Sequence, residues 1–129
     1  MRNSTNGWCI AIFVLLLVLL QSCHSKEQKI ITTPKIELGS VKCGDTTQFN
    51  IECINNGSSN IVLTRIYVLC SCIRSVDNLK KVVPSRSKTT YTFEYKIEGI
   101  GYVEKHIYLY FNDSKTPYIT TISSFVELK

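Results

Sequence analysis

The chain has 129 residues, of which 44% are hydrophobic and 19% are charged, and its formal net charge is +5 at pH 7. This length suits one domain, and the hydrophobic content excludes a chain that is disordered throughout. The 15 lysine and arginine residues are scattered rather than gathered into a dense basic stripe, which argues against a nucleic-acid-binding protein.

The first segment is typical of a signal peptide. Residues 8–20 read WCIAIFVLLLVLL, thirteen apolar residues without a charge, and Arg2 is the only charged residue before them. As a helix this run would extend about 20 Å, which is less than the ~30 Å hydrocarbon core of a membrane. A secretory signal peptide is therefore favoured, with an uncleaved, tilted membrane helix as the alternative.

The motif Leu20-Gln21-Ser22-Cys23 resembles the lipobox of bacterial lipoproteins, although Gln21 departs from the small residue usual at that position. The resemblance implies cleavage before Cys23 and acylation of its thiol, so that residues 1–22 form a lipoprotein signal peptide. We expect residues 23–34 to be a flexible tether and residues 35–129 to form the domain. The mature protein would then be lipid-anchored in the bacterial cell envelope, at the outer membrane. The alternative is an ordinary signal peptide that happens to contain a cysteine.

Beyond the tether, apolar and polar residues alternate as they do in β-strands. In chain order, strands are predicted at residues 36–41, 48–54, 61–72, 90–97, 103–111 and 118–128, with a less regular stretch at 74–88. The residues Asn55-Asn56-Gly57-Ser58 predict a turn, and a change of apolar parity near Thr64-Arg65 predicts a β-bulge. The pattern indicates an all-β fold, an antiparallel β-sandwich of about seven strands.

One core is predicted between the two sheets, because the apolar residues of several strands share the period of two. Its predicted members are Phe49, Ile51, Leu63, Ile66, Phe93, Tyr95, Ile107 and Leu109.

The domain resembles a known family through four stretches in order: Ile36-Glu37-Leu38-Gly39 with Gly44-Asp45, then Asn55-Asn56-Gly57, then Cys70-Ser71-Cys72, then Asn112-Asp113 with Pro117. The family is the bacterial hydin-like immunoglobulin family catalogued as domain of unknown function fifteen seventy-three, whose members are often lipoproteins. The resemblance covers residues 36–126 and implies an immunoglobulin-like sandwich, but no activity. Ser71 stands where the family usually has glycine, and Cys43 and Cys53 are additional to its pattern.

The sequence offers no recognisable set of catalytic residues. His106 occupies an outward strand position without a neighbouring nucleophile, the carboxylates are scattered, and neither a phosphate-binding loop nor a metal-ligand spacing of histidine and carboxylate is present. We therefore predict a protein that is not an enzyme, that has no cofactor and that acts on no small-molecule substrate.

Four cysteines remain in the predicted domain: Cys43, Cys53, Cys70 and Cys72. An oxidising compartment favours disulfides. Residues i and i+2 of an extended strand have Cα atoms ~6.6 Å apart, at the upper edge of the disulfide range, so a bridge from Cys70 to Cys72 can form but would be strained. The favoured prediction is a bridge from Cys70 or Cys72 to Cys43 or Cys53. The alternatives are a thiol-redox pair, a Cu(I) site at Cys70 and Cys72, or cysteines that act only as small buried hydrophobes.

Three tyrosines, Tyr102, Tyr108 and Tyr110, share the outward face of the predicted strand 103–111. They are candidates for a protein-binding face, and the alternative is the ordinary preference of tyrosine for strands. The predicted function is a lipid-anchored, non-enzymatic envelope module that binds a protein partner or supports an assembly. The alternative function is thiol-redox or Cu(I) handling by Cys70-Ser71-Cys72.

Overall fold

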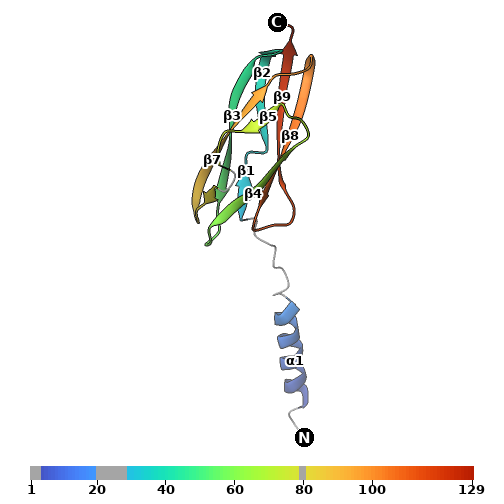
Figure 1. The fold of residues 1–129 in the computed structure, drawn as a ribbon. Coiled ribbons are helices and arrows are strands. Elements are labelled where there is room, and N and C mark those ends of the chain that lie inside the picture. Colours follow the sequence, from blue (N-terminus) through green and yellow to red (C-terminus); the bar gives the residue numbers. More distant parts are fainter. Residues whose placement is uncertain (1–3, 20–28, 79–80) are drawn as a thin grey trace.

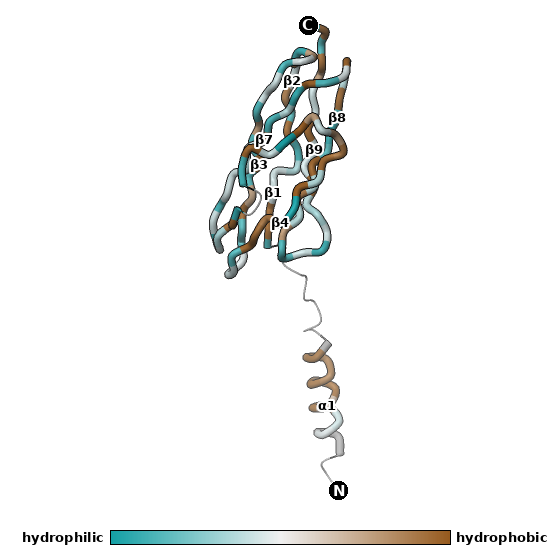
Figure 2. The backbone as a smooth tube through the Cα atoms, in the orientation of Figure 1, coloured by the Kyte–Doolittle hydropathy of each residue, from teal (hydrophilic) through white to brown (hydrophobic). Residues whose placement is uncertain are grey.

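The computed structural model describes residues 4–19, 29–78 and 81–129. The first element is helix α1 (Ser4–Leu19), which is hydrophobic over its C-terminal part (Figures 1 and 2). Among the described residues, no helix has the length and apolar character needed to cross a membrane. Cys23, the rest of the lipobox-like motif and the first half of the predicted tether, residues 23–28, lie outside the described residues, so cleavage and acylation stay predictions.

The domain is a sandwich of two sheets, as the alternating pattern predicted (Figure 1). One sheet has four strands in the order β1-β3-β7-β5, and the other has five in the order β2-β9-β8-β4-β6. The strands are β1 (Ile30–Thr32), β2 (Lys35–Lys42), β3 (Thr46–Asn55), β4 (Ile61–Val68), β5 (Ile73–Ser75), β6 (Val82–Val83), β7 (Ser87–Lys96), β8 (Gly101–Phe111) and β9 (Tyr118–Glu127).

The core lies between the sheets and is built from alternate residues of the long strands, so brown and teal alternate along them in Figure 2. Seven of the eight predicted core residues are buried, and Ile66 is half-buried against them. Phe49 and Phe93 lie opposite each other in the register of β3 and β7, with ring centroids 5.5 Å apart. Stacked rings of this size contribute both buried area and aromatic contact to the core.

The predicted bulge is confirmed, because the pairing of β4 with β8 shifts its register between Leu63 and Arg65. The predicted turn after β3 is confirmed as well. Asn55 is fully buried at the end of β3, and its Oδ1 accepts a hydrogen bond of 2.9 Å from the backbone N of Gly57.

The prediction of a wholly antiparallel sandwich is wrong in one place, since β2 pairs with β9 in parallel. The chain runs from β1 into β2 through only Thr33 and Pro34, so it passes from one sheet to the other without reversing. The carbonyl O of Pro34 accepts a hydrogen bond of 3.0 Å from the N of Thr121, which fixes this crossing beside β9. Gly39, with φ of +70°, lies where the register of β2 shifts between Glu37 and Ser40.

The domain also begins earlier than predicted. Residues 30–32, assigned to the tether, form β1, and Ile30 is fully buried in the core. Two further strands, β5 and β6, lie in the stretch predicted to be irregular. The third predicted strand ends at Val68 rather than at Cys72, because the chain turns there to reach the opposite sheet.

Candidate functional site

Cys70 and Cys72 lie in the turn that carries the chain from β4 in the five-stranded sheet to β5 in the four-stranded sheet. They are joined by a disulfide, with Cα atoms 5.2 Å apart. The extended strand predicted through Cys72 would have held these atoms ~6.6 Å apart. Because the backbone turns after Val68 instead, the separation falls within the usual range for a disulfide.

The predicted bridge to Cys53 is therefore wrong, and the strand register explains why. Cys53 pairs with Thr89 of β7, whereas the carbonyl O of Cys72 accepts a hydrogen bond of 2.8 Å from the N of Lys96, seven positions further along that strand. At ~3.3 Å per residue the two cysteines are about 23 Å apart along β7. They lie at opposite poles of the sandwich.

The predicted bridge to Cys43 is not formed either, although Cys43 and Cys72 do lie at the same pole. The N of Gly44, next to Cys43, donates to the carbonyl O of Ile97 just beyond β7. The turn at Cys43 leads into β3, whereas Cys72 precedes β5, and β7 lies between those two strands. Two strand spacings separate β3 from β5, about 10 Å, which exceeds the reach of a disulfide.

Cys43 and Cys53 are free thiols. Cys53 is fully buried among the core residues, and this burial raises the pKa of its thiol to about 12. A thiol with such a pKa stays protonated at neutral pH and is a poor nucleophile. Of the four cysteines predicted to form a site, the structure therefore brings together only Cys70 and Cys72.

The bridge from Cys70 to Cys72 is expected to stabilise the fold less than a long-range bridge would. In the chain-entropy view of disulfides, closing a loop of three residues is worth about 1.6 kcal/mol, against about 3 kcal/mol for the loop of roughly twenty residues that a bridge to Cys53 would close. A staple for the sandwich is therefore a weak explanation for this disulfide.

A hollow of about 210 Å³ opens beside Cys70. It is lined by Val68, Leu69, Cys70, Glu104, Lys105 and His106. Leu69 is 76% exposed and Cys70 is half-buried, whereas Cys72 is only 5% exposed. The disulfide thus presents one of its two cysteines to the surface.

His106 is engaged with neighbouring polar groups on β8 and β9. Its Nδ1 lies 3.0 Å from Thr121 Oγ1, and its Nε2 lies 3.7 Å from a carboxylate oxygen of Glu104. Within the described part of the chain, no group of three or more histidine, cysteine and acidic side chains is arranged to hold a metal ion.

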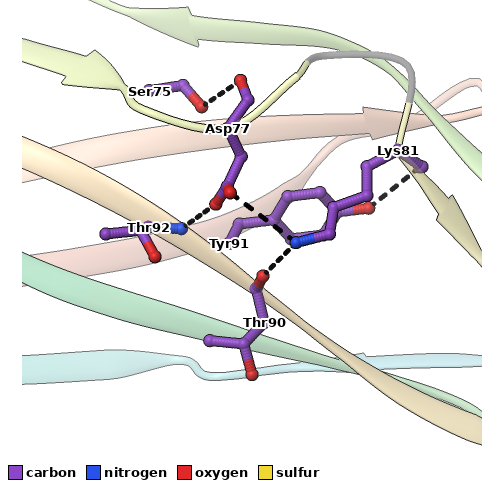
Figure 3. A network of polar contacts seen from close by, with 6 residues as sticks. All are labelled: Ser75, Asp77, Lys81, Thr90, Tyr91 and Thr92. Carbon is purple, nitrogen blue, oxygen red and sulfur yellow. Dashed lines mark hydrogen bonds and ion pairs between the residues drawn. The ribbon is translucent and has the colours of Figure 1, made fainter.

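Figure 3 shows a second polar cluster, in which Asp77 and Lys81, from the chain between β5 and β6, contact residues of β7. The carboxylate of Asp77 accepts a hydrogen bond from the backbone N of Thr92, and one of its oxygens lies 3.7 Å from Lys81 Nζ. Lys81 Nζ in turn donates a hydrogen bond of 2.8 Å to the carbonyl O of Thr90. The hydroxyl of Tyr91 donates 3.1 Å to the carbonyl O of Lys81, and burial raises the pKa of this tyrosine. These groups bond to one another and to the backbone, so the cluster has a structural role.

The three predicted tyrosines do share one surface, the outer side of the five-stranded sheet. The register adds neighbours from the adjoining strands, since Tyr108 lies between Tyr67 of β4 and Ile119 of β9. We call this surface the outer aromatic face, and its members are Arg65, Tyr67, Tyr102, Tyr108, Tyr110, Ile119 and Phe125. The sequence indicated that Tyr67 points outward, because it stands between Ile66 and Val68, which share the inward parity. The outward position of Phe125 is established only by its register with Tyr102.

Two contacts within the outer aromatic face position the rings of Tyr67, Tyr108 and Tyr110. The guanidinium carbon of Arg65 lies 4.1 Å from the ring centroid of Tyr110, and the rings of Tyr67 and Tyr108 are 5.9 Å apart. Tyr102 is 65% exposed, Phe125 is 52% exposed, and Tyr67 and Ile119 are about half exposed. The face is therefore an ordered, largely uncovered aromatic surface.

The outer side of the four-stranded sheet is different in chemistry. There Lys88 Nζ lies 3.2 Å from Glu52 Oε1, and Arg74 Nη2 lies 2.6 Å from Glu94 Oε1. Charged groups on neighbouring strands therefore form ion pairs with one another. Tyrosines chosen only for their preference for strands would be expected on both outer surfaces. Their concentration on one surface favours a binding role.

Comparisons with known proteins agree with this fold. The family described as "Protein of unknown function (DUF1573)" matches residues 30–126, which run from the first residue of β1 into β9. No curated protein matches the chain. The match confirms the family resemblance inferred from the sequence and places the start of the domain at Ile30.

Three solved structures illustrate the likeness. A protein of unknown function from Porphyromonas gingivalis W83 has a TM-score of 0.63 and 16% identity, with 74% of this chain and 46% of that chain covered. The VesB protease of Vibrio cholerae has a TM-score of 0.63 and 10% identity, with coverages of 76% and 32%. PapD-like domain 7 of human CEP192 has a TM-score of 0.57 and 12% identity, with coverages of 78% and 87%.

This chain spans less than half the length of the Porphyromonas and Vibrio chains, whereas it spans most of the CEP192 domain. At these identities the likeness shows the fold alone, a two-sheet immunoglobulin-like or PapD-like sandwich. Because the family match covers most of the sequence, the chain belongs to the DUF1573 family.

Proposed function

We propose that this protein is a lipid-anchored, non-enzymatic module of the bacterial cell envelope that binds a protein partner through its outer aromatic face. The observation that carries the proposal is the gathering of Tyr67, Tyr102, Tyr108 and Tyr110 on one open side of the sandwich. Tyrosine and arginine are enriched where proteins bind one another, because they offer a large contact area together with a polar group.

The surroundings of the face suit a folded protein partner. A hollow of about 360 Å³ lies beside Tyr102 and Phe125. It is also lined by Lys35 and Glu37, whose Nζ and Oε1 atoms form an ion pair of 2.9 Å. Charges of both signs around exposed rings resemble the polar rim and apolar centre of protein interfaces. A nucleic acid would instead require a surface of one charge sign.

The anchor is supported by the sequence around Cys23. A run of thirteen apolar residues precedes Leu20-Gln21-Ser22-Cys23, and the sandwich begins seven residues after that cysteine. Such a short connection would hold the domain close to the membrane, which we propose to be the outer membrane. The partner would then be another envelope protein within reach of that surface.

A non-enzymatic role is part of the same proposal. The candidate acid–base groups that the structure describes are committed to local contacts: His106 with Thr121 and Glu104, and Asp77 with Thr92 and Lys81. A catalytic site would require such groups to converge on a pocket that can hold a substrate.

Position-specific crosslinking tests the proposal. Benzoylphenylalanine is placed at Tyr67 in the full chain in its native envelope, and at Asn50 as the matched control, because Asn50 is exposed on the outer side of β3. We expect one discrete protein adduct from position 67 and none from position 50. Adding Tyr108→Ala and Tyr110→Ala should abolish the adduct while circular dichroism shows that the sandwich is retained.

Two results would contradict the proposed face. One is an adduct of equal yield from positions 50 and 67. The other is a position-67 adduct that persists in the chain carrying Tyr108→Ala and Tyr110→Ala. An adduct with lipid alone would identify the face as a membrane-contacting surface and would also refute a protein partner.

A further inference from the structure

The two ends of the Cys70–Cys72 disulfide are unequally held. Cys72 is 5% exposed, and its carbonyl O is fixed by the hydrogen bond from Lys96 N in β7. Cys70 is half-buried, stands between the exposed residues Leu69 and Ser71, and lines the hollow described above. An attacking group therefore reaches Cys70 more easily than Cys72, so the disulfide has one accessible cysteine and one sheltered cysteine.

The hollow beside Cys70 suits an incoming thiolate. The thiolate is the nucleophile in disulfide exchange, and nearby positive charge favours it. Lys105 brings that charge to the hollow, and Val68 and Leu69 supply apolar walls. Glu104 opposes the effect, but its carboxylate accepts a hydrogen bond of 3.0 Å from Tyr102 and lies 3.7 Å from His106.

The pairing of the strands on both sides of the turn does not include this bond. The strands on both sides of the turn are secured without it, since β4 pairs with β8 and β5 pairs with β7. The bridge closes only three residues, so opening it releases a turn and leaves both sheets paired. A redox site needs a protein that stays folded in both oxidation states, and this arrangement provides it.

We propose that Cys70 and Cys72 form an exchangeable redox pair that oxidises dithiols of other proteins, one dithiol for each disulfide. This exchange is stoichiometric rather than catalytic, so it is compatible with a non-enzymatic binding module. The proposal does not rest on the proposed function, because it requires no contact with the outer aromatic face. It is favoured over Cu(I) binding, since Cu(I) needs both sulfurs as free thiolates and the structure joins them in a disulfide.

The reaction balances without a further reagent. A thiolate of the partner dithiol attacks Cys70 Sγ and forms a mixed disulfide, while the bond between the two cysteines breaks and its electron pair goes to Cys72 Sγ, which takes up a proton. The second partner thiol, as a thiolate, attacks the partner sulfur of the mixed disulfide and releases Cys70, which takes up the other proton. The partner loses two electrons and two protons, and Cys70 and Cys72 become thiols.

Differential alkylation of the full chain tests the exchange directly. Cleavage after arginine and lysine places Cys70 and Cys72 together in residues 66–74, and Cys43 and Cys53 together in residues 43–65. We expect the native protein, held in about 1 mM dithiothreitol at neutral pH, to open the bond within about ten minutes, so that the 66–74 peptide gains two alkyl groups. Re-exposure to oxidised glutathione should restore the bond.

Single-cysteine variants test which sulfur is attacked. Cys72→Ala leaves Cys70 as the one thiol of the 66–74 peptide, and Cys70→Ala leaves Cys72 there as its matched control. The glutathione adduct is followed on this peptide, so the free thiol of Cys43 in the 43–65 peptide does not contribute. We expect the chain with Cys70 to form a mixed disulfide with oxidised glutathione at least about tenfold faster than the chain with Cys72. Circular dichroism of each variant shows whether the sandwich is retained.

Two outcomes overturn the proposal. In the first, the wild-type bond stays closed in dithiothreitol unless denaturant is added, which identifies a structural disulfide. In the second, Cys72 reacts as fast as Cys70, which removes the accessible sulfur from the mechanism. Should either variant fail to fold, the wild-type measurement still decides between an exchangeable and a structural bond.

Discussion

Asn55 joins three parts of the chain through one buried side chain. Its Nδ2 donates to the carbonyl oxygens of Ser59, at 2.8 Å, and Val83, at 3.1 Å, while its Oδ1 accepts from Gly57 N. Asn55→Ala leaves these backbone groups unpaired, so we expect the free energy of unfolding to fall by about 2–3 kcal/mol. Urea denaturation measures it. Asn50→Ala, at an exposed site of the same strand, should change stability by less than about 0.5 kcal/mol.

Cys53 makes the stability of the domain sensitive to alkaline pH. Burial raises the pKa of its thiol from 9.0 to about 12, so the unfolded chain loses this proton at a lower pH than the folded chain does. The stabilisation is therefore complete below pH 9 and is lost as the pH rises toward 12. The free energy of unfolding should fall by up to about 1.4 kcal/mol per pH unit in this window.

The variant Cys53→Ala isolates this effect. Tyrosines 91, 95 and 118 also have raised pKa values, but their ordinary value is 10.0, so they contribute mainly above pH 10. Denaturation between pH 9 and 10 should therefore show a steeper decline for the wild type than for Cys53→Ala. Equal slopes in that interval would mean that the thiol is not buried as the structure has it.

Strand β1 belongs to the core although it has only three residues. Ile30 is fully buried, whereas its neighbour Ile31 is 49% exposed. Ile30→Ala should lower the free energy of unfolding by about 2–4 kcal/mol, because it opens a cavity, and Ile31→Ala should change it by less than about 0.5 kcal/mol. Thermal or urea denaturation compares the two. Equally small changes in the free energy of unfolding for the two variants would mean that residues 30–32 belong to the tether and not to the core.

Long strands were predictable from the sequence because period two needs several residues to show. Strands β3, β7 and β8 match their predicted ranges closely, and even the bulge between Leu63 and Arg65 was visible as a change of parity. Strands β1, β5 and β6 have two or three residues each, too few to establish a period. The parallel pairing of β2 with β9 depends on residues far apart in sequence, so no local pattern indicates it.

The cysteine site was predictable only in part. The residue types and the predicted oxidising compartment favoured a disulfide that involves Cys70 or Cys72, but its partner depended on where the strand before them ends. Because β4 stops at Val68, the two cysteines meet in the following turn. Cys53 faces the core as well, but it lies at the opposite end of the sandwich. The alternation of apolar and polar residues shows which face a residue occupies and does not show its position along the sheet.

The outer aromatic face was likewise predictable for the three tyrosines of one strand. Its breadth was not, since Tyr67 and Phe125 join it only through the register of β4 and β9 with β8. Which residues of different strands share a face depends on strand pairing, and the sequence of a single strand does not reveal that pairing.

At the scale of the whole molecule, the proposed anchor is open to a direct test. Cys23→Ala removes the thiol that would be acylated, so we expect the protein to pass from the membrane fraction into the soluble fraction, because the lipid chains supply the membrane affinity. Fractionation with a carbonate wash measures this. Cys9→Ala, a cysteine exposed on α1, is the matched control and should stay with the membrane. Retention of the Cys23→Ala protein would point to a membrane-spanning first segment.

The position of β9 bears on the order in which the domain can fold. It is the last of the nine strands among the described residues, yet it lies between β2 and β8 in the larger sheet, and Lys42 pairs with Glu127 across 85 positions. The larger sheet therefore cannot close until residues 118–127 have been synthesised. Contacts between such distant segments slow folding. If the protein is exported as proposed, the larger sheet would stay incomplete inside an export channel until β9 emerges.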